Sequence, residues 1–313
     1  MKPVVGITIG DAAGIGPEIT LKAVRDAGVV EVCRPLLIGD EAHLRGFDGF
    51  PDDVEVHDLK NLPGTFDIGV DAAVTGKAAA ENIEAAVKLW KAGEIDAICT
   101  APISKKAIGL GGYDFPGHTE FLAELTDTND FRMSFFAGSL RTVLLSTHVS
   151  LLDAIALVKK DAVAELIRFT SREMKTLLGR DVSIAVAGLN PHASEDGMFG
   201  GEEGEEIVPA IAECLAEGIN VSGPFSPDTI FLRGYNGEFD AVIALYHDQA
   251  TVAVKSLSFG SGVNVTLGLP VIRTSVDHGT AYDIAGKGVA DHSSMVSAIK
   301  LAAELAKLSP KFA

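Results

Sequence analysis

The sequence predicts an α/β protein built on a mostly parallel sheet. Short apolar runs recur along the chain, and several are β-branched without alternation, which is typical of strands covered on both faces. Helical patterns lie between many of these runs, and such alternation favours parallel strands joined by helices. The 313 residues suit one large domain or two lobes around a cleft. The runs expected to form strands are 4–9, 35–38, 97–99, 142–146, 182–187, 241–245 and 271–276.

Helical patterns fill several of the intervals between these runs. They cover residues 17–27, 78–91, 119–125, 161–178, 203–217 and 293–308. Pro17 suits the first turn of its helix, where its missing N–H is no loss, and Glu18 beside it complements the helix dipole. Asp161 is expected to be the N-cap of its helix.

Charge and cysteine content exclude several classes of protein. The net charge of -17 argues against a nucleic-acid binder and against a polybasic membrane contact, because both need clustered Lys and Arg. It still permits an anionic substrate held by a few focused cations. Cys33, Cys99 and Cys214 form no CxxC pair, so neither a disulfide framework nor a zinc–thiolate site is expected, and a cytoplasmic location is favoured. No stretch reaches the roughly 20 apolar residues of a membrane span.

Three histidines, His148, His192 and His247, each lie just after a predicted strand. In open α/β sheets ligands bind beyond the carboxyl ends of the strands, so these residues are candidates for a site. Neutral imidazoles suit Zn, Co, Ni, Mn or Fe, and three protein ligands leave positions open for a substrate. The separations match no local metal motif, so the pattern alone fits either a metal site or three structural histidines.

Further candidates follow other strands. The stretch 10–16 reads G-x-x-x-G-x-G, which lacks the dinucleotide fingerprint and fits either a tight strand-to-helix turn or a backbone surface close to a ligand. Thr119 is suited to cap the helix after His118, and a helix N-terminus beside an imidazole also suits an anion. Lys255 and Arg273 end apolar runs, which fits surface charges or the recognition of phosphate or carboxylate.

Long motifs then carry a family resemblance. They are GDAAGIGPEIT, TAPISKKA, GHTEFLAELT, STHVSL, GLNPHASEDGMFGGEE, GPFSPDTIF, ALYHDQATVAVK and GVNVTLGLPVIRTSVDHGTAYDIAGKG. These segments resemble the 4-hydroxythreonine-4-phosphate dehydrogenase family of vitamin B6 biosynthesis, with its phospho-threonate and phospho-erythronate dehydrogenase relatives. They run from Gly10 to Gly288 and so cover nearly the whole chain.

The resemblance implies a two-lobed α/β/α subunit, similar to isocitrate and isopropylmalate dehydrogenases, with the active site in the interlobe cleft. Residues 1–127 with 285–313 are expected to form the first lobe. Residues 128–284 are expected to form the second, which carries the metal ligands and the dimer contacts. A homodimer with a shared active site follows, with His247 of the partner subunit completing the metal site.

The resemblance also assigns the site residues. The expected metal ligands are His148, His192 and His247, which bind one divalent ion (Zn, Co, Mg, Mn or Ni) and are catalytic together with Asp248. The expected substrate-binding residues are His118, Thr119, Lys255, Asn264 and Arg273. The segment 278–288 looks like the adenosine loop of isopropylmalate dehydrogenases, so Gly279, Thr280, Ala281 and Asp283 are expected to bind NAD. Asp283 would meet the ribose hydroxyls, and its carboxylate would repel a 2′-phosphate.

The implied reaction is NAD-dependent, metal-dependent oxidation of the C3 hydroxyl of 4-hydroxythreonine-4-phosphate, with loss of CO₂ to give 3-amino-2-oxopropyl phosphate. The metal would lower the pKa of the alcohol, and Asp248 or Asp277 would orient a histidine or relay a proton. Ala12 stands where the family usually has Pro, and Ala250-Thr251-Val252 where it usually has Gly-Leu-Pro. These departures leave open the same chemistry on 4-phospho-D-threonate or 4-phospho-D-erythronate, or an aromatic cis-dihydrodiol.

Two rival functions belong to other classes. A phosphate-acyl transferase presents a similar α/β/α cleft, and a metal-storing or ligand-sensing module could use the same scaffold. Neither needs NAD, so NADH absorbance on mixing with phosphorylated hydroxy acids separates them from a dehydrogenase.

Overall fold

The computed structural model describes residues 2–51, 53–258 and 261–308, which form two compact units. The first unit combines the chain up to Phe131 with residues 268–307, and the second contains residues 132–267. The division expected from the sequence differs in residues 128–131 and 268–284, which it assigns to the second lobe. Residues 309–313, which the sequence-based division assigns to the first lobe, lie outside the described part of the chain.

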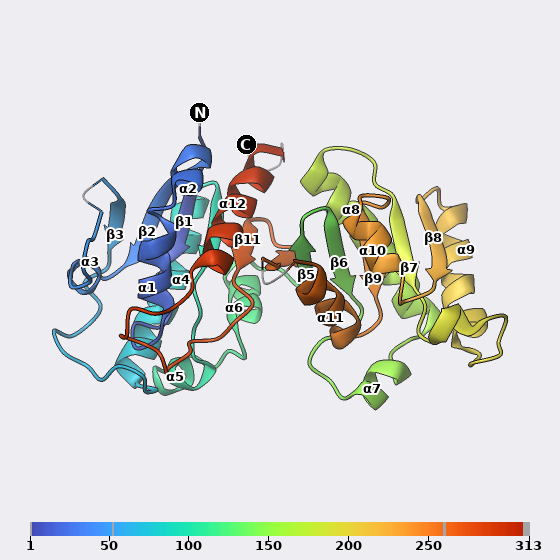
Figure 1. The fold of residues 1–313 in the computed structure, drawn as a ribbon, viewed down its shortest axis with the longest axis horizontal. Coiled ribbons are helices and arrows are strands. Elements are labelled where there is room, and N and C mark those ends of the chain that lie inside the picture. Colours follow the sequence, from blue (N-terminus) through green and yellow to red (C-terminus); the bar gives the residue numbers. More distant parts are fainter. Residues whose placement is uncertain (1, 52, 259–260, 309–313) are drawn as a thin grey trace. The chain divides into compact units, whose positions relative to one another are not determined.

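The sheet of the first unit is entirely parallel, with the strand order β3-β2-β1-β4-β11 (Figure 1). Its strands are β1 (Val4–Thr8), β2 (Arg34–Gly39), β3 (Glu55–Asp58), β4 (Ala97–Thr100) and β11 (Ile272–Ser275). Strands β4 and β11 are fully buried because helices cover both faces of the sheet. Their carboxyl ends therefore meet at one edge.

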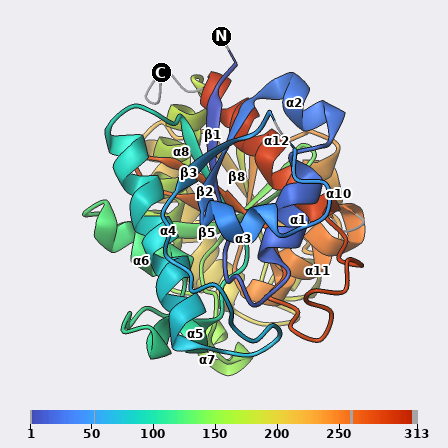
Figure 2. The same ribbon diagram turned by 90° about the vertical axis from the view of Figure 1, so that its left-hand side faces the viewer.

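Figure 2 shows α4 on one face of this sheet and α1 and α12 on the other. The helices of the unit are α1 (Gly16–Ala23), α2 (Ala27–Val32), α3 (Glu41–Arg45), α4 (Ala73–Lys91), α5 (Lys105–Leu110), α6 (His118–Leu125) and α12 (Ser293–Leu308). Ile83 of α4, Ile98 of β4 and Phe121 of α6 belong to one buried apolar cluster. Helix α6 is thereby fixed beside the sheet, with its N-terminus at His118.

The second unit has a mixed sheet with the strand order β10-β5-β6-β9-β7-β8. Its strands are β5 (Arg132–Ala137), β6 (Leu140–Leu144), β7 (Ile184–Ala187), β8 (Val221–Phe225), β9 (Ala241–Ala244) and β10 (Val263–Leu267). β5 runs antiparallel to both of its neighbours, β10 and β6, whereas the strands from β6 to β8 are parallel. The carboxyl ends of β6, β9 and β7 lie side by side as a result.

The helices of the second unit are α7 (Leu151–Ala156), α8 (Lys160–Leu178), α9 (Val208–Ala216), α10 (Ile230–Tyr235) and α11 (His247–Ser258), with a short turn at Pro191–Ser194 and a π-helical turn at Glu203–Ile207. Phe231 of α10 and Val254 of α11 pack with Phe135 and Val242 of the sheet in one apolar cluster. In Figure 2, α8 lies on the opposite side of this sheet from α10 and α11. The α/β fold class predicted from the sequence is confirmed.

Every predicted strand is present, but several local predictions were wrong. The helix expected over 17–27 ends at Ala23, because the Asp26 side chain accepts a hydrogen bond from Gly28 N at 2.9 Å and caps a new helix. Asp161 lies in the first turn of α8, whose N-cap is Lys159. Thr119 is likewise inside α6, whose N-cap is Gly117. Strands β3, β5, β8 and β10 were not predicted. Within the described residues no helix is both long enough and apolar enough to cross a membrane.

Candidate functional site

The three candidate histidines leave three adjacent parallel strands of the second unit. His148 follows β6, His247 begins α11 directly after β9, and His192 lies in the turn after β7. Because β9 pairs with both β6 and β7 in parallel, these segments emerge at the same edge of the sheet. The structure thus places the three histidines after the carboxyl ends of neighbouring strands, and their role as metal ligands stays a prediction.

Two buried side chains tie these strand ends together. Ser146 Oγ donates to the carbonyl of Leu245 at 3.0 Å, which joins the ends of β6 and β9. Gln249 Oε1 accepts from Leu245 N at 2.7 Å, and its Nε2 donates to the carbonyl of Gly188 at 2.8 Å, which joins β9 to β7. Sequence reasoning passed over Gln249, although its place directly after His247 and Asp248 is a signal that could have found it.

His148 and His247 face each other within one chain. Their ring centroids lie 5.7 Å apart. Two imidazoles bound to one tetrahedral metal would have centroids about 5 Å apart, given metal–nitrogen distances of about 2.0–2.1 Å. Asp248 Oδ1 lies 2.7 Å from His247 Nδ1, so it orients the ring and leaves Nε2 available to a cation. This pair therefore fits two ligands of one metal ion.

His192 occupies an unusual backbone segment. Five consecutive residues, 192–196, have positive φ values between 47° and 69°, and none of them is glycine. A left-handed backbone costs an L-residue about 1–2 kcal/mol, so the surrounding structure must hold this turn. The His192 ring contacts Phe199, with centroids 6.3 Å apart. Among the described residues, no three His, Cys, Asp or Glu side chains are grouped so that they could hold a metal ion.

Glu203 supplies much of the support for this turn. Its side chain is buried, and Oε1 accepts from Leu189 N at 2.8 Å and from Asn190 N at 2.7 Å. Oε2 accepts from Asn190 Nδ2 at 2.8 Å. Three hydrogen bonds to one buried carboxylate fix the residues that lead into His192. Sequence reasoning missed Glu203, since nothing in the run of acidic residues distinguishes it from the other glutamates beside it.

The first unit holds a buried cation at Arg273. The side chain is 3% exposed, and its Nη2 donates to Thr100 Oγ1 at 2.9 Å. Burial lowers the pKa of Arg273 to about 10, so the guanidinium keeps its charge at neutral pH. A charge in this position is a candidate to receive an anion.

His118 lies close enough to Arg273 to feel its charge. Burial, and then the charge of Arg273, hold the pKa of His118 well below its ordinary value of 6.5, so its ring is neutral at pH 7. Its Nε2 is buried and makes no hydrogen bond within the described residues. The ring stands at the N-terminus of α6, where backbone N–H groups point outward. Thr119 is the second residue of this helix.

Lys255 and Asn264, the other predicted substrate-binding residues, belong to the second unit. Lys255 lies two turns along α11 from His247 and is exposed. Asn264 lies on β10 opposite Phe135, and its Oδ1 is buried without a hydrogen-bond partner in the described residues. Both assignments stay predictions.

The predicted cofactor segment follows β11 in the first unit. Gly279 and Thr280 enter a loop in which Ala281 adopts a left-handed φ of 43° and Asp283 is exposed. Ile15 N donates to the carbonyl of Thr280 at 3.0 Å, and a Cβ on Gly14 would lie 2.9 Å from the same oxygen. The glycine-rich stretch is thus a tight turn whose backbone approaches this loop of the protein.

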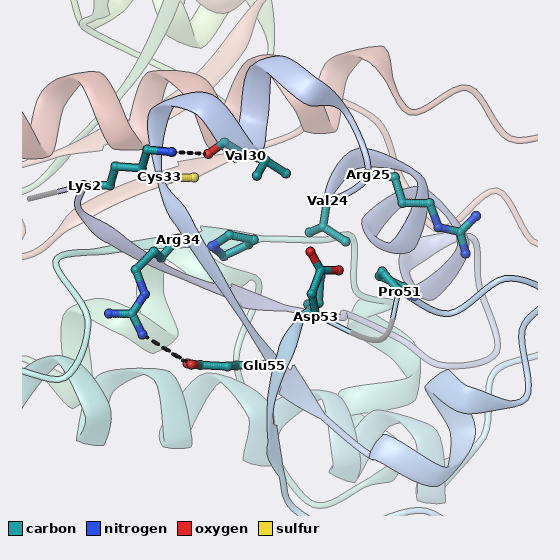
Figure 3. Close-up of a pocket in the computed structure, with 11 residues that line it drawn as sticks. Lys2, Val24, Arg25, Val30, Cys33, Arg34, Pro51, Asp53 and Glu55 are labelled. Atoms are coloured by element: carbon teal, nitrogen blue, oxygen red, sulfur yellow. Dashed lines mark hydrogen bonds and ion pairs between the residues drawn. The ribbon is translucent and has the colours of Figure 1, made fainter.

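A cavity of about 420 Å³ lies elsewhere in the first unit, beside residues that precede the strands (Figure 3). Its cations contact the protein itself, since Lys2 Nζ donates to the carbonyl of Val30 at 2.9 Å and Arg34 lies 3.3 Å from Glu55. Burial raises the pKa of the Cys33 thiol to about 11, so this cysteine is not a nucleophile at neutral pH. None of the predicted site residues lines this cavity.

Comparison with known proteins gives consistent matches over almost the whole chain. The family model described as "Pyridoxal phosphate biosynthetic protein PdxA" matches residues 18–302. A 4-hydroxythreonine-4-phosphate dehydrogenase of Desulforapulum autotrophicum is 47% identical, over 96% of this chain and 95% of that protein. A D-threonate 4-phosphate dehydrogenase of Cupriavidus necator is 46% identical, over 97% of each.

A solved structure matches equally well. The crystal structure of a 4-hydroxythreonine-4-phosphate dehydrogenase from Burkholderia phymatum superposes with a TM-score of 0.85 at 43% identity, covering 97% of this chain and 98% of that one.

Protonation of His118 is predicted to destabilise the protein in acid. The pKa of His118 is lower in the folded state than in the unfolded state. As pH falls below about 6.5, the unfolded state therefore binds a proton at His118 that the folded state does not bind. The free energy of unfolding therefore decreases from pH 8 to pH 5, and His118→Asn makes that decrease smaller. Urea melts at both pH values measure it. The wild-type protein and His118→Asn are compared first at pH 8, where both side chains are neutral. An equal decrease in the free energy of unfolding of the two proteins between pH 8 and pH 5 would contradict the prediction.

Glu203→Ala is predicted to lower the free energy of unfolding by about 3 kcal/mol, because buried donors lose a charged acceptor. Glu203→Gln keeps one acceptor oxygen and should cost about half as much. The exposed neighbour Glu205 is the matched control, and Glu205→Ala should stay within about 0.5 kcal/mol. Denaturant melts measure the free energy of unfolding of all three variants. An unchanged value for Glu203→Ala would contradict the role of Glu203 in supporting the turn.

Proposed function

Because the chain belongs to the PdxA family, and is therefore a dehydrogenase, we propose that it oxidises the C3 hydroxyl of a phosphorylated four-carbon hydroxy acid with NAD and a divalent metal ion. Membership implies a nicotinamide cofactor, NAD or NADP, and a phosphorylated hydroxy acid as substrate. The loss of CO₂ from the oxidised acid completes the proposed reaction. The substrate that we propose first is 4-hydroxythreonine-4-phosphate.

The buried guanidinium of Arg273 carries the assignment of an anionic substrate. The planar guanidinium offers several N–H donors in a fixed arrangement, and phosphate or carboxylate oxygens match its geometry. The neutral ring of His118 and the start of α6, including Thr119, would add uncharged donors to the same anion. A diol that carries neither phosphate nor carboxylate would offer Arg273 no anionic group to bind.

D-Threonate 4-phosphate is the second candidate substrate. Relatives named for it and relatives named for 4-hydroxythreonine-4-phosphate match this chain at almost the same identity, 46% and 47%. The two acids differ at C2, where one carries a hydroxyl and the other an amino group. Both would present the same anionic ends to Arg273, so the proposed chemistry is common to them.

The chain's own residues would prepare the substrate hydroxyl for oxidation. His148 and His247 would hold a divalent cation between their rings, and Asp248 would keep the His247 ring in the required tautomer. Lys255 and Asn264 are proposed to contact the substrate, as the resemblance implies. When bound, the cation supplies Lewis-acid polarisation of the hydroxyl, and NAD supplies the hydride acceptor. Asp283 is proposed to favour NAD over NADP, because its carboxylate would repel a 2′-phosphate.

A second copy of the chain is proposed to complete the metal site. The segments after His148 and His192 expose large apolar side chains: Leu151 is 59%, Leu152 77% and Met198 73% exposed. Exposed apolar side chains of this size favour burial against another subunit. The family resemblance implies that the third ligand is His247 of the partner subunit, but the proximity of His148 and His247 in one chain makes His192 the alternative shared ligand.

The substrate is tested by following NADH formation with 4-hydroxythreonine-4-phosphate, 4-phospho-D-threonate, 4-phospho-D-erythronate and a cis-dihydrodiol. We expect turnover of phosphorylated acids only. Arg273→Gln should raise KM for them by roughly 10- to 100-fold, the equivalent of about 1.5–3 kcal/mol. Arg45→Gln, at an exposed ion pair of α3, is the matched control and should leave KM unchanged. Turnover of the unphosphorylated diol alone would refute the proposal.

The metal site is tested by chelation and by mixing inactive variants. Chelator treatment should abolish activity, and a divalent cation should restore it. Co-expressed His148→Ala and His192→Ala chains should regain part of the activity if His192 is the shared ligand, because one of the two sites in a mixed dimer is then intact. Co-expressed His148→Ala and His247→Ala chains should regain it if His247 is shared. Activity in neither mixture would contradict a shared site, and full activity without metal would contradict the metal.

A further inference from the structure

The hydroxyl of Tyr282 joins three motifs that lie far apart in the sequence. It donates to Asp11 Oδ2 at 2.7 Å and lies 3.2 Å from Asp71 Oδ1. Asp11 belongs to the glycine-rich turn after β1, and Tyr282 belongs to the loop after β11. The same Asp71 oxygen accepts from the hydroxyl of Ser104, which follows β4 and caps α5. Three neighbouring parallel strands thus have their carboxyl ends connected by one small network.

The hydroxyl of Tyr282 keeps its proton and donates it, while Asp71 accepts as a carboxylate. Burial, and then the carboxylate of Asp11, raise the pKa of Tyr282, so its hydroxyl remains a donor throughout the physiological range. The hydrogen bond from Ser104 holds the pKa of Asp71 below its ordinary value. Asp11 is fully buried, and its other oxygen accepts from Ala13 N at 2.9 Å. A buried carboxylate with these partners is a rigid anchor.

Tyr282 anchors the loop 278–288 at the residue next to Asp283. Upstream, the loop is held at Thr280 by Ile15 N, and downstream Glu18 accepts from Ala290 N at 2.8 Å. Between Tyr282 and Ala290 the loop is largely exposed. Lys287 Nζ donates to the carbonyl of Asp283 within the loop, and Lys22 Nζ of α1 donates to the carbonyl of Gly288 at 3.0 Å. The left-handed φ of Ala281 adds strain directly before the anchor, so the loop needs a firm contact there.

We propose that Tyr282 is a positioning residue for the cofactor: its hydroxyl, held by Asp11, fixes the loop 278–288 so that Asp283 is placed to meet the ribose of NAD. This inference rests on the proposed role of that loop. Tyr282 touches no reacting atom in this scheme, so it sets the affinity for NAD and leaves the rate of the chemical step unchanged. A pre-ordered loop binds more tightly because less conformational entropy is lost on binding.

Tyr282→Phe removes the hydroxyl alone and tests the proposal in the full-length enzyme. The KM and Kd for NAD should rise about tenfold, the equivalent of about 1.4 kcal/mol. The kcat, and the KM for the hydroxy acid, should stay within about twofold. Hydrogen exchange should become faster in the peptide covering 278–288. Tyr235→Phe, in α10 of the second unit, is the matched control and should change none of these values.

A double-mutant cycle with Asp283→Ala separates this inference from the proposed function. If Tyr282 acts through Asp283, Tyr282→Phe should raise Kd for NAD by less than about twofold in the Asp283→Ala background. A full tenfold effect in that background, or an unchanged Kd in Tyr282→Phe alone, overturns the positioning role. An unchanged Kd in Asp283→Ala alone instead overturns the assignment of the cofactor loop. Should Tyr282→Phe lower kcat as strongly as it raises KM, the role is not one of positioning.

Discussion

Parallel pairing of neighbouring strands is the constraint on which both units depend. β1, β4 and β11 in the first unit, and β6, β9 and β7 in the second, run the same way, so each set of loops leaves its sheet at one edge. Residues that are more than 250 positions apart, such as Asp11 and Tyr282, meet for this reason. No side chain needs to reach across a sheet for such a site to form.

Parallel strands bring the loops to one edge but do not fix their conformations. That task falls to buried polar side chains that bond to the backbone of a neighbouring strand end. Gln249 does this between β9 and β7, Ser146 between β6 and β9, and Glu203 within the turn that carries His192. Each bond lies out of water, where losing one partner is costly, so the arrangement is specific. The strained turn at His192 persists because the hydrogen bonds of Glu203 hold the residues that lead into it.

The sequence predicts most of the strands and the residues at their ends, because burial on both faces leaves a continuous apolar run and a polar residue then ends it. It does not predict the supporting contacts. Glu203 stands in a run of acidic residues, and only the fold shows that it alone is buried among backbone donors. β5 and β10 escaped notice because they are antiparallel strands interrupted by Ser134 and Asn264. The N-caps at Gly117 and Lys159 were each predicted two residues too late, since N-cap propensity ranks Thr119 and Asp161 above the residues that the structure uses.

Net charge and local charge have opposite consequences in this protein. A chain of net charge -17 repels an anionic substrate at long range, yet screening limits that repulsion to about 10 Å in ordinary salt. Close to the sheet edge, the charge of Arg273 acts through a medium of low dielectric constant, where one cation outweighs many distant carboxylates. Burial would remove the charge of a lysine more easily than that of an arginine, whose pKa stays near 10 even here. Burial, and then the positive charge of Arg273, hold the pKa of His118 well below its ordinary value and keep this ring neutral. In the proposed site, one buried arginine beside an uncharged histidine would bind an anion without requiring a basic surface.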